Sequence, residues 1–555
     1  MSQSDFSVRL RQELSLPETY PVDEDASVAL TSLIVSAARD QNPICNLRQL
    51  VDIITRIGGM SYLDALTLLP ILLPHSRDGT EELLSLIGTE CSGKEVIMAV
   101  QESLERLSVQ NSSGDYADDE EEYTPAILQC SRAMWLYSDA IPRIPLHKKT
   151  TRDIVKPLLP ELQSVIAQAG PDASASEGRA LIRSASRLVT ILSDLDKEQT
   201  DNDASGESAM RDLLASFLMS ILETCTNDTG SKLASSAFEK HFPRLIIDPS
   251  AGAPASSDDI ISQAWEALES LGLSFADMES KPSLGTFVLL AHTSYPFTMR
   301  SLASFFPIIL TAIQANVALD EVISVLISTL VPLYSQTPRP EMQPNLIIPL
   351  AHVLPPLASV HPDPSTRLQI FRLFSVVLSL TPSPLRLQLL QGLLTDQDSS
   401  PQMRIATVGL VKDAVLEALA KPMGSADRNR DVFASRMFLQ LLSPILWQLD
   451  PPDLFDSYNL SLSDFLETAE PLRLVECLAL YYVLVNRDVQ NGTGVRDKDN
   501  LRNIRRTLLD PLRRQFDRWD ANTDAVSNHE SYMQLGILEM WLERVNDIST
   551  TLVDT

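Results

Sequence analysis

Residues 364–367 read Pro-Ser-Thr-Arg, and residues 401–404 read Pro-Gln-Met-Arg, a near-copy about 37 residues further along the chain. The apolar positions that follow the two copies stay in step. They pair Leu368 with Ile405, Phe371 with Val408, Leu373 with Leu410, Phe374 with Val411 and Leu378 with Val415. A period near 40 residues that holds two helices is typical of stacked helical-hairpin repeats. The duplication therefore predicts a repeat protein, an architecture that usually works as a surface for binding.

The residues around the two copies predict how each helix begins. Pro364 and Pro401 stand at first helical positions, where proline is favoured, and Asp363 is an expected N-cap. Arg367 and Arg404 lie one turn in, where each could reach the acidic cap of its own or an adjacent repeat. An aspartate at the turn and an arginine early in the following helix are typical of HEAT repeats. Residues 381–386 and 470–473 contain the same pattern. If Pro-x-Arg marks only the start of a helix, the pattern still predicts a series of consecutive helices.

Helical periodicity runs almost throughout, with no stretch of convincing strand alternation, and prolines (35) outnumber glycines (19). We predict an all-α fold: an irregular HEAT- or armadillo-like helical-repeat solenoid of roughly ten helix pairs. The expected segments are N-terminal helical repeats at 1–107, a disordered acidic loop at 108–123, middle repeats at 124–247, a linker loop at 248–258, central HEAT-like repeats at 259–487, and C-terminal capping helices with a basic face at 488–555.

Composition narrows the class of partner. The formal net charge is −28 and the sequence pI is about 4.6, so nucleic acid and anionic membranes are poor default partners, although acidity also serves solubility alone. The longest near-apolar run, residues 322–333, is too short for a bilayer span of about 20 residues. Five widely spaced cysteines without Cys-x-x-Cys indicate reduced thiols. We expect a soluble protein of the cytoplasm that is also compatible with the nucleus.

The sequence offers no motif for catalysis. Its seven histidines are far apart, and no phosphate-binding glycine loop, dinucleotide fingerprint or nucleophile elbow is present. Cys477 lies in an apolar segment, where packing explains it better than reactivity. We therefore predict no enzyme activity, no small-molecule substrate, and no catalytic, cofactor-binding or metal-binding residue.

One segment stands out from the acidic background. Residues 496–519 are rich in arginine with interleaved aromatic residues, a composition enriched at protein interfaces. Pro511 is expected to kink or divide the helix. The alternative is an ordinary repeat helix whose arginines pair with Asp510, Asp517 and Asp520. The predicted partner-binding residues are Arg502, Arg505, Arg506, Arg513, Arg514, Arg518 and Trp519.

The segment from Leu354-Pro355-Pro356 through residues 401–406 (Pro-Gln-Met-Arg-Ile-Ala) to residues 411–415 (Val-Lys-Asp-Ala-Val) resembles the glomulin, plant lateral-root-formation and fungal YAP-binding family. The resemblance covers about 60 residues and implies HEAT-like repeats without catalytic activity. The family's animal member caps the RING subunit of cullin-based ubiquitin ligases through C-terminal helices and blocks recruitment of the ubiquitin-conjugating enzyme. Its fungal members are linked to the oxidative-stress transcription factor and to kinetochores. No binding residue can be carried over by alignment.

These observations predict a non-enzymatic adaptor or regulator that binds protein partners along a pre-formed surface. By resemblance, the partner is a RING subunit of a cullin ligase or a stress-response transcription factor. Two alternatives remain at this point: a general assembly or transport scaffold, and a thiol-based redox regulatory subunit.

Overall fold

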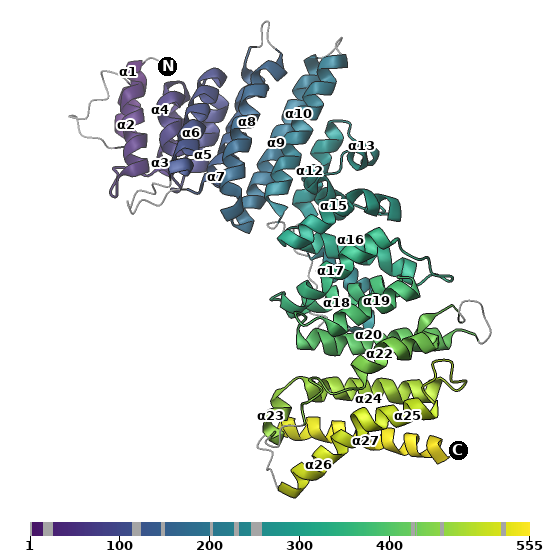
Figure 1. Ribbon diagram of the computed structural model, residues 1–555. Helices are drawn as coiled ribbons and strands as arrows, with labels where there is room; N and C mark the ends of the chain where they lie inside the picture. Colours follow the sequence, from purple (N-terminus) through teal and green to yellow (C-terminus); the bar gives the residue numbers. More distant parts are fainter. Residues whose placement is uncertain are drawn as a thin grey trace. The chain divides into compact units, whose positions relative to one another are not determined.

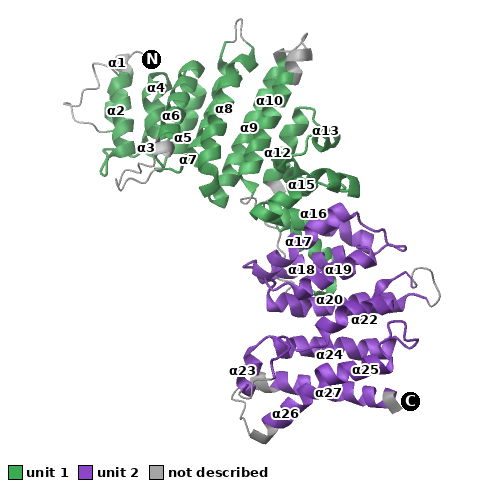
Figure 2. Cartoon of the chain, in the orientation of Figure 1, with its two compact units in different colours: residues 1–325 green, residues 326–555 purple. Residues whose placement is uncertain are grey.

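The computed structural model describes residues 3–14, 26–113, 124–145, 150–199, 204–226, 232–245, 258–422, 428, 430–455, 460–522 and 529–554. These residues form helices joined by turns and loops, with no β-strand among them. The chain divides into two compact units, Met1–Val325 and Leu326–Thr555 (Figure 2). The division falls inside helix α16 and within the predicted repeat segment 259–487.

Unit 1 is built from helices stacked in two rows (Figure 1). One row is α1, α3, α5, α7, α9 and α12, and the other is α2, α4, α6, α8, α10 and α14, each helix packing on the next of its row. The helices are α1 (Gln3–Glu13), α2 (Ala26–Arg39), α3 (Leu47–Ile57), α4 (Ala65–Leu72), α5 (Thr80–Glu90), α6 (Gly93–Ser113), α7 (Ala126–Ala140), α8 (Thr151–Ala169), α9 (Ala175–Gln199), α10 (Ala204–Thr224), α11 (Leu233–His241), α12 (Asp258–Ser270), α13 (Phe275–Ser280), α14 (Leu284–His292), α15 (Met299–Ala315) and the first part of α16 (Leu319–Tyr334).

Helix α3 shows how the sequence sets these boundaries. Asn46 caps its start in a capping box with Gln49, each side chain accepting from the other's backbone amide. Gly58 ends it in the left-handed conformation, with φ at 73°, as its glycine predicts. Gly59 is needed for a different reason, since a Cβ there would lie 2.5 Å from the ring of Phe6.

The predicted acidic loop at 108–123 begins too early. Helix α6 continues to Ser113, because residues 108–113 contain neither proline nor glycine to end it. The remainder of that segment, 114–123, lies outside the described residues.

Unit 2 continues the stacked pattern within itself. Helix α20 packs on α24, and α24 on α27, while α19 packs on α22. Its helices are α17 (Pro344–Val360), α18 (Pro364–Ser379), α19 (Ser383–Thr395), α20 (Pro401–Ala420), α22 (Arg436–Leu446), α23 (Leu462–Glu467), α24 (Glu470–Arg487), α25 (Lys498–Ile504), a π-helical segment (Arg505–Leu509), α26 (Asp510–Asn522) and α27 (His529–Asp554).

The duplicated phrase builds equivalent helix starts, as predicted. Pro364 and Pro401 are the first residues of α18 and α20, and α19 lies between them, so one period holds two helices. Asp363 is the N-cap of α18 and accepts a 2.7 Å hydrogen bond from the Thr366 amide. Ser400 caps α20 in the same way. The all-α repeat architecture is therefore confirmed.

The arginines of the duplicated phrase contact different acceptors. Arg404 pairs with Asp450 at 2.9 Å, in the loop that follows α22, which is the expected contact with an adjacent repeat. Arg367 instead donates to the backbone carbonyls of His361 and Pro362, at 2.7 and 3.1 Å. The prediction that Arg367 pairs with an acidic cap is wrong, because the Asp363 carboxylate already accepts hydrogen bonds from Thr366 in capping α18.

Two related arginines hold unit 2 together from within. Arg473, in the related segment 470–473, forms a buried pair with Glu470 at 2.6 Å and also donates to the Gln448 carbonyl. Arg386 is buried and pairs with Glu417 of α20 at 2.9 Å. Buried charges of this kind are costly unless they are paired. The Arg386–Glu417 pair joins α19 to α20. Glu470 and Arg473 both lie in α24, and it is the bond from Arg473 to the Gln448 carbonyl that joins this helix to the loop after α22.

Candidate protein-interaction surface

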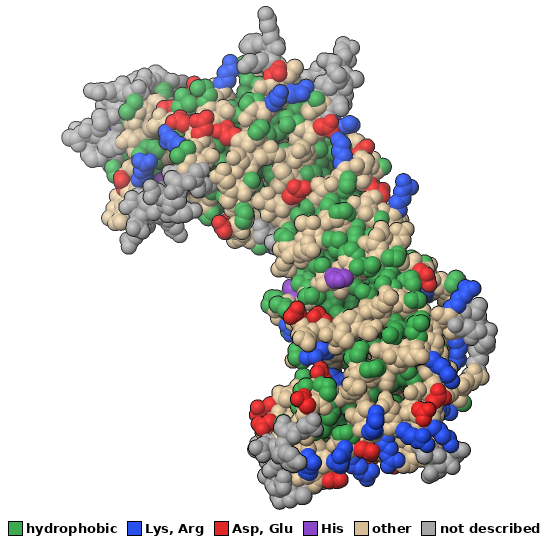
Figure 3. Space-filling view, viewed as in Figure 1, with side chains coloured by type: hydrophobic (Ala, Val, Ile, Leu, Met, Phe, Trp, Pro, Cys, Tyr) green, Lys and Arg blue, Asp and Glu red, His purple; other side chains and the backbone are tan. Residues whose placement is uncertain are grey.

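The six predicted arginines lie along the continuous helical run formed by α25, the π-helical segment and α26. All six are exposed. Between residues 502 and 518 the chain carries these six arginines and only two aspartates, within a protein of formal net charge −28. Lys and Arg side chains gather over this C-terminal part of unit 2 (Figure 3). We call Arg502, Arg505, Arg506, Arg513, Arg514 and Arg518 the arginine face.

The opposite side of the same run is buried and anchors the arginine face. Leu508, Leu512 and Phe516 point into the core. Trp519 corrects the predicted interface: it is buried, its Nε1 donates to the Leu460 carbonyl at 3.1 Å, and its ring lies 5.1 Å from that of Phe465. It falls on the apolar side because the helix places it one turn after Phe516 and two turns after Leu512. Trp519 therefore holds the helix in place and is not available to a partner.

The break expected at Pro511 takes the form of a wide turn. The helix continues through it, and five residues, Arg505–Leu509, adopt π-helical geometry, closed by the Asp510 amide donating to the Arg505 carbonyl. Proline has no amide hydrogen, so Pro511 cannot make the usual bond to the residue four positions earlier. The arginines before and after Pro511 consequently remain on one rigid element.

The carboxylates near the arginine face neutralise it only weakly. Arg505 lies 3.4 Å from Asp510 and Arg502 lies 3.6 Å from Asp499, and all four side chains are more than half exposed. Exposed pairs of this kind contribute at most about 1 kcal/mol. Among the described residues, no ion pair joins Asp517 to an arginine, and the side chain of Asp520 lies outside them. The alternative prediction was that these arginines pair with Asp510, Asp517 and Asp520. Among the described side chains, only the pair between Arg505 and Asp510 is formed.

An apolar strip that the sequence reading missed lies on α22, a helix that contacts the arginine-bearing run near both of its ends. Helix α22 runs along α25, since Arg436 meets Asp497 at 3.6 Å and Thr507 donates to the Trp447 carbonyl at 2.9 Å. On α22, Met437 and Leu441 are 50% and 37% exposed. The available signal was helical phase: the buried residues of α22 are Phe438, Leu439, Leu442 and Leu446, which leaves Met437 and Leu441 on the other side.

The cysteines do not form a reactive site. All five are buried. Burial raises the pKa of Cys91 to about 11 and the pKa values of Cys130 and Cys477 to about 12, so these thiols are protonated near neutral pH. Within the described residues, no group of three His, Cys, Asp or Glu side chains is placed to bind a metal ion. The same part of the chain contains no helix long and apolar enough to cross a bilayer.

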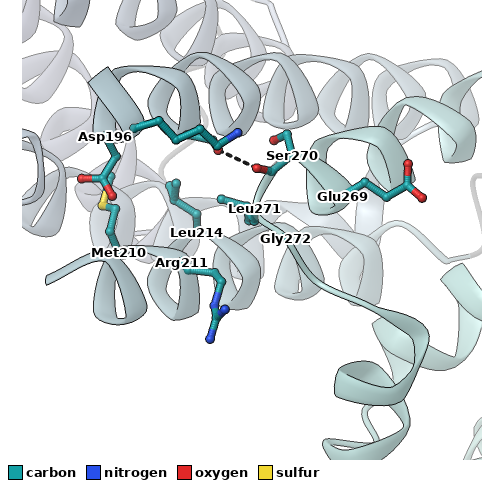
Figure 4. Close-up of a pocket in the computed structure, with 10 residues that line it drawn as sticks. Asp196, Met210, Arg211, Leu214, Glu269, Ser270, Leu271 and Gly272 are labelled. Carbon is teal, nitrogen blue, oxygen red and sulfur yellow. Dashed lines mark hydrogen bonds between the residues drawn. The ribbon is translucent and has the colours of Figure 1, made fainter. Parts of the chain in front are cut away.

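A shallow pocket in unit 1 also lacks the groups for chemistry. It lies between α9, α10 and α12, and Ser193 closes one side by donating to the Ser270 carbonyl at 3.1 Å (Figure 4). Charges of both signs line it, from Asp196, Arg211 and Glu269. No nucleophile paired with a base stands in this lining, so the pocket does not compete with the arginine face as the candidate site.

Comparison with known proteins supports the resemblance noted in the sequence. Residues 285–541 match the model of an uncharacterised protein family described as YAP/Alf4/glomulin. No curated protein matches the chain. Among solved structures, one similar chain is a circular tandem repeat protein with novel repeat topology and enhanced subunit contact surfaces; it is 11% identical, the match covers 99% of this chain and 98% of that one, and the TM-score is 0.17. The arginine face lies wholly inside the region matched by the family model.

Proposed function

We propose that this protein, whose residues 285–541 match the YAP/Alf4/glomulin family model, is a non-enzymatic adaptor that binds a protein partner through the arginine face. The observation that carries the proposal is the exposure of six arginines on one helical run whose opposite side is packed into unit 2. Anchored helices lose little conformational freedom on binding, which favours affinity.

The chemistry of the surface favours a partner with carboxylates around an apolar centre. The arginine guanidinium binds carboxylates through paired hydrogen bonds, and Met437 and Leu441, exposed on the adjoining helix α22, offer apolar area. Binding would shield the partner or present it to others by steric means, without a chemical step. The finer proposal, by family, is that the partner is a RING subunit of a cullin ubiquitin ligase or an oxidative-stress transcription factor in the cytoplasm or nucleus.

Affinity capture from cell extract, with the four central arginines reversed, tests the proposal. The variant carries glutamate at Arg505, Arg506, Arg513 and Arg514. A matched control reverses four exposed cations of unit 1, Arg48, Arg106, Lys281 and Arg300. We expect the arginine-face variant to lose its main partner by at least about tenfold, as charge reversal at an interface does, while the control keeps it.

The outcomes separate the broad proposal from the finer one. If every captured partner binds the arginine-face variant as well as the parent, this face is structural and the proposed binding surface is wrong. If partners depend on the face but include neither a cullin–RING component nor a stress transcription factor, the adaptor role stands and the family-based partner is wrong, which leaves an assembly or transport scaffold.

A further inference from the structure

A second surface, in unit 1, combines an exposed tryptophan with arginines. Trp135 is 40% exposed, although it lies in α7, a helix whose other apolar residues from Ile127 to Ala140 are buried almost throughout. Helix α7 packs between α5 and α9 in one row of unit 1. Tryptophan and arginine are both enriched at binding hot spots, and an exposed indole offers a large, rigid apolar surface to a partner.

The tryptophan is held in one orientation by a neighbouring helix. The guanidinium of Arg187 in α9 lies over the Trp135 ring, 3.8 Å from its centroid, and pairs with Asp139 of α7 at 2.8 Å. A guanidinium stacked on an indole and fixed by a half-buried carboxylate keeps a defined position. The surface at this point is therefore pre-formed.

Two further arginines extend the surface along α9. Arg183 and Arg179 stand one and two turns before Arg187 on the same side of the helix. Arg183 is exposed and Arg179 half-buried. In the described part of the chain, neither forms an ion pair within 4.0 Å, whereas Arg187 does. Their positive charge is left available to a ligand.

We propose that Trp135, Arg179, Arg183 and Arg187 form a second docking surface, the α7–α9 surface, which binds an extended acidic peptide segment of a partner protein. The arginines repeat every four residues, about 6 Å along the helix. Alternate residues of an extended peptide lie about 6.6 Å apart, so carboxylates at every second position can meet successive arginines. An apolar side chain at the end of the acidic run then covers Trp135.

Charge complementarity favours a short acidic peptide over nucleic acid. Unit 1 holds 46 of the chain's 73 acidic residues against 24 of its 45 basic ones, so a long polyanion is repelled by the unit as a whole. At physiological salt the screening length is about 8 Å, and a peptide of a few residues then responds mainly to the arginines beside it. The α7–α9 surface lies outside residues 285–541, so it is independent of the arginine face.

Fluorescence anisotropy with the full chain tests this proposal. The probe is a labelled 12-residue peptide in which glutamate alternates with serine and which ends in leucine; a second peptide carries glutamine in place of each glutamate. The arginine face is first silenced by its four glutamate substitutions, so that binding there does not contribute. We expect the glutamate peptide to bind and the glutamine peptide not to bind.

Substitutions within the α7–α9 surface then locate the contact. Arg183→Glu should weaken binding at least about tenfold, and Trp135→Ala about 30-fold. Arg300→Glu, an exposed arginine elsewhere in unit 1, should leave it unchanged. Trp135→Ala also removes the stacking partner of Arg187, so its effect is not due to Trp135 alone. Arg183→Gln leaves that stacking in place and removes one positive charge, with an expected loss of about threefold. Equal binding of the two peptides, indifference to Arg183→Glu and Arg183→Gln, or preferential binding of a single-stranded oligonucleotide would each overturn the proposal.

Discussion

At the scale of single residues, Asp363 stabilises the start of α18, the helix that begins with the first copy of the duplicated motif, Pro364–Arg367. Its carboxylate accepts from the Thr366 hydroxyl at 2.6 Å and the Thr366 amide at 2.7 Å, and these bonds lower the pKa of Asp363 below its usual value. A carboxyl whose folded-state pKa is lowered stabilises the fold above its unfolded pKa near 4, and this stabilisation is lost as the pH falls through the folded value.

We therefore expect Asp363→Ala to loosen the first turn of α18 at pH 7 and to have little effect well below pH 4. Loss of an N-cap costs about 1 kcal/mol, so amides of the first turn should exchange with solvent about fivefold faster. Hydrogen exchange measured by mass spectrometry, corrected for the pH dependence of intrinsic exchange, reports this. Asp363→Asn, which can still cap and does not titrate, should behave like the parent at pH 7. Equal exchange in Asp363→Ala and the parent at pH 7 would contradict the assignment.

Glu470 and Arg473 show that the arginine of the repeated motif has different partners in different copies. Here it forms a buried ion pair. Both side chains are at most 10% exposed, and Arg473 also donates to the Gln448 carbonyl. Removing one member of a buried pair leaves the other charge unpaired, at a cost of about 3–5 kcal/mol. We expect Glu470→Ala to destabilise unit 2 by that amount, and Glu470→Ala combined with Arg473→Met to be less destabilising than Glu470→Ala alone.

Urea denaturation followed by circular dichroism, completed with the Arg473→Met single variant, measures this coupling. The matched comparison is Arg502→Met, whose pair with Asp499 is exposed and should change stability by less than about 1 kcal/mol. Additive effects at positions 470 and 473 would show that the two charges are stabilised independently.

At the scale of helices, the sequence predicted where helices occur and in which order better than it predicted which side of each helix faces the core. Pro364 and Pro401 fixed two helix starts because proline at the first helical position acts through local geometry alone. Trp519 was assigned to the surface because interface composition does not say which side of a helix faces the core. Once Leu508, Leu512 and Phe516 define that side, Trp519 follows from helical phase.

The π-helical segment and the apolar strip on α22 had no comparable local signal. Pro511 indicates an irregularity, but whether the chain bends, breaks or widens depends on the packing of Leu508 and Leu509 beneath it. Met437 and Leu441 were not predicted as surface residues, because spacing alone does not separate an exposed apolar residue of a helix from a core residue. Both features depend on contacts between helices, which sequence spacing does not specify.

Trp519 provides the test at this scale. Trp519→Ala removes its hydrogen bond to Leu460 and its contacts with Phe465, and should destabilise the packing of α26 by about 3–5 kcal/mol. We expect faster hydrogen exchange throughout α26 and weaker partner binding, although no arginine has changed. Trp519→Phe should retain most of the packing. An unchanged exchange pattern in Trp519→Ala would mean that other contacts suffice to hold the arginine face.

At the scale of the whole molecule, the burial of the thiols argues against redox regulation. Each of the five cysteines is buried, and burial raises the pKa values of Cys45, Cys91, Cys130 and Cys477. Only the thiolate is nucleophilic, so reaction requires local opening. Titration of the native chain with a thiol reagent at pH 7.5 should therefore show no rapidly reacting cysteine, and all five should react in denaturant. One or more rapidly reacting native thiols would revive the redox alternative.

Acidic charge is distributed unequally between the two units, and this distribution has a measurable consequence. Unit 1 carries 46 acidic and 24 basic residues, whereas unit 2 carries 27 and 21. Like charges destabilise a compact state through self-repulsion, which salt screens. Raising the salt concentration from about 0.02 M to 0.3 M, where screening lengths fall from roughly 20 Å to 6 Å, should slow hydrogen exchange in unit 1 more than in unit 2.

The arginine face should respond to salt in the opposite direction. Its attraction for an acidic partner weakens as the same ions screen it, so partner affinity should fall over the range in which unit 1 gains protection. Exchange by mass spectrometry and partner anisotropy, recorded on one salt series, separate the two effects. If both units gained protection equally, nearby basic residues would already neutralise the excess acidic charge of unit 1. The arginines of the α7–α9 surface that are unpaired in the described part of the chain could then not be explained by that excess of acidic charge.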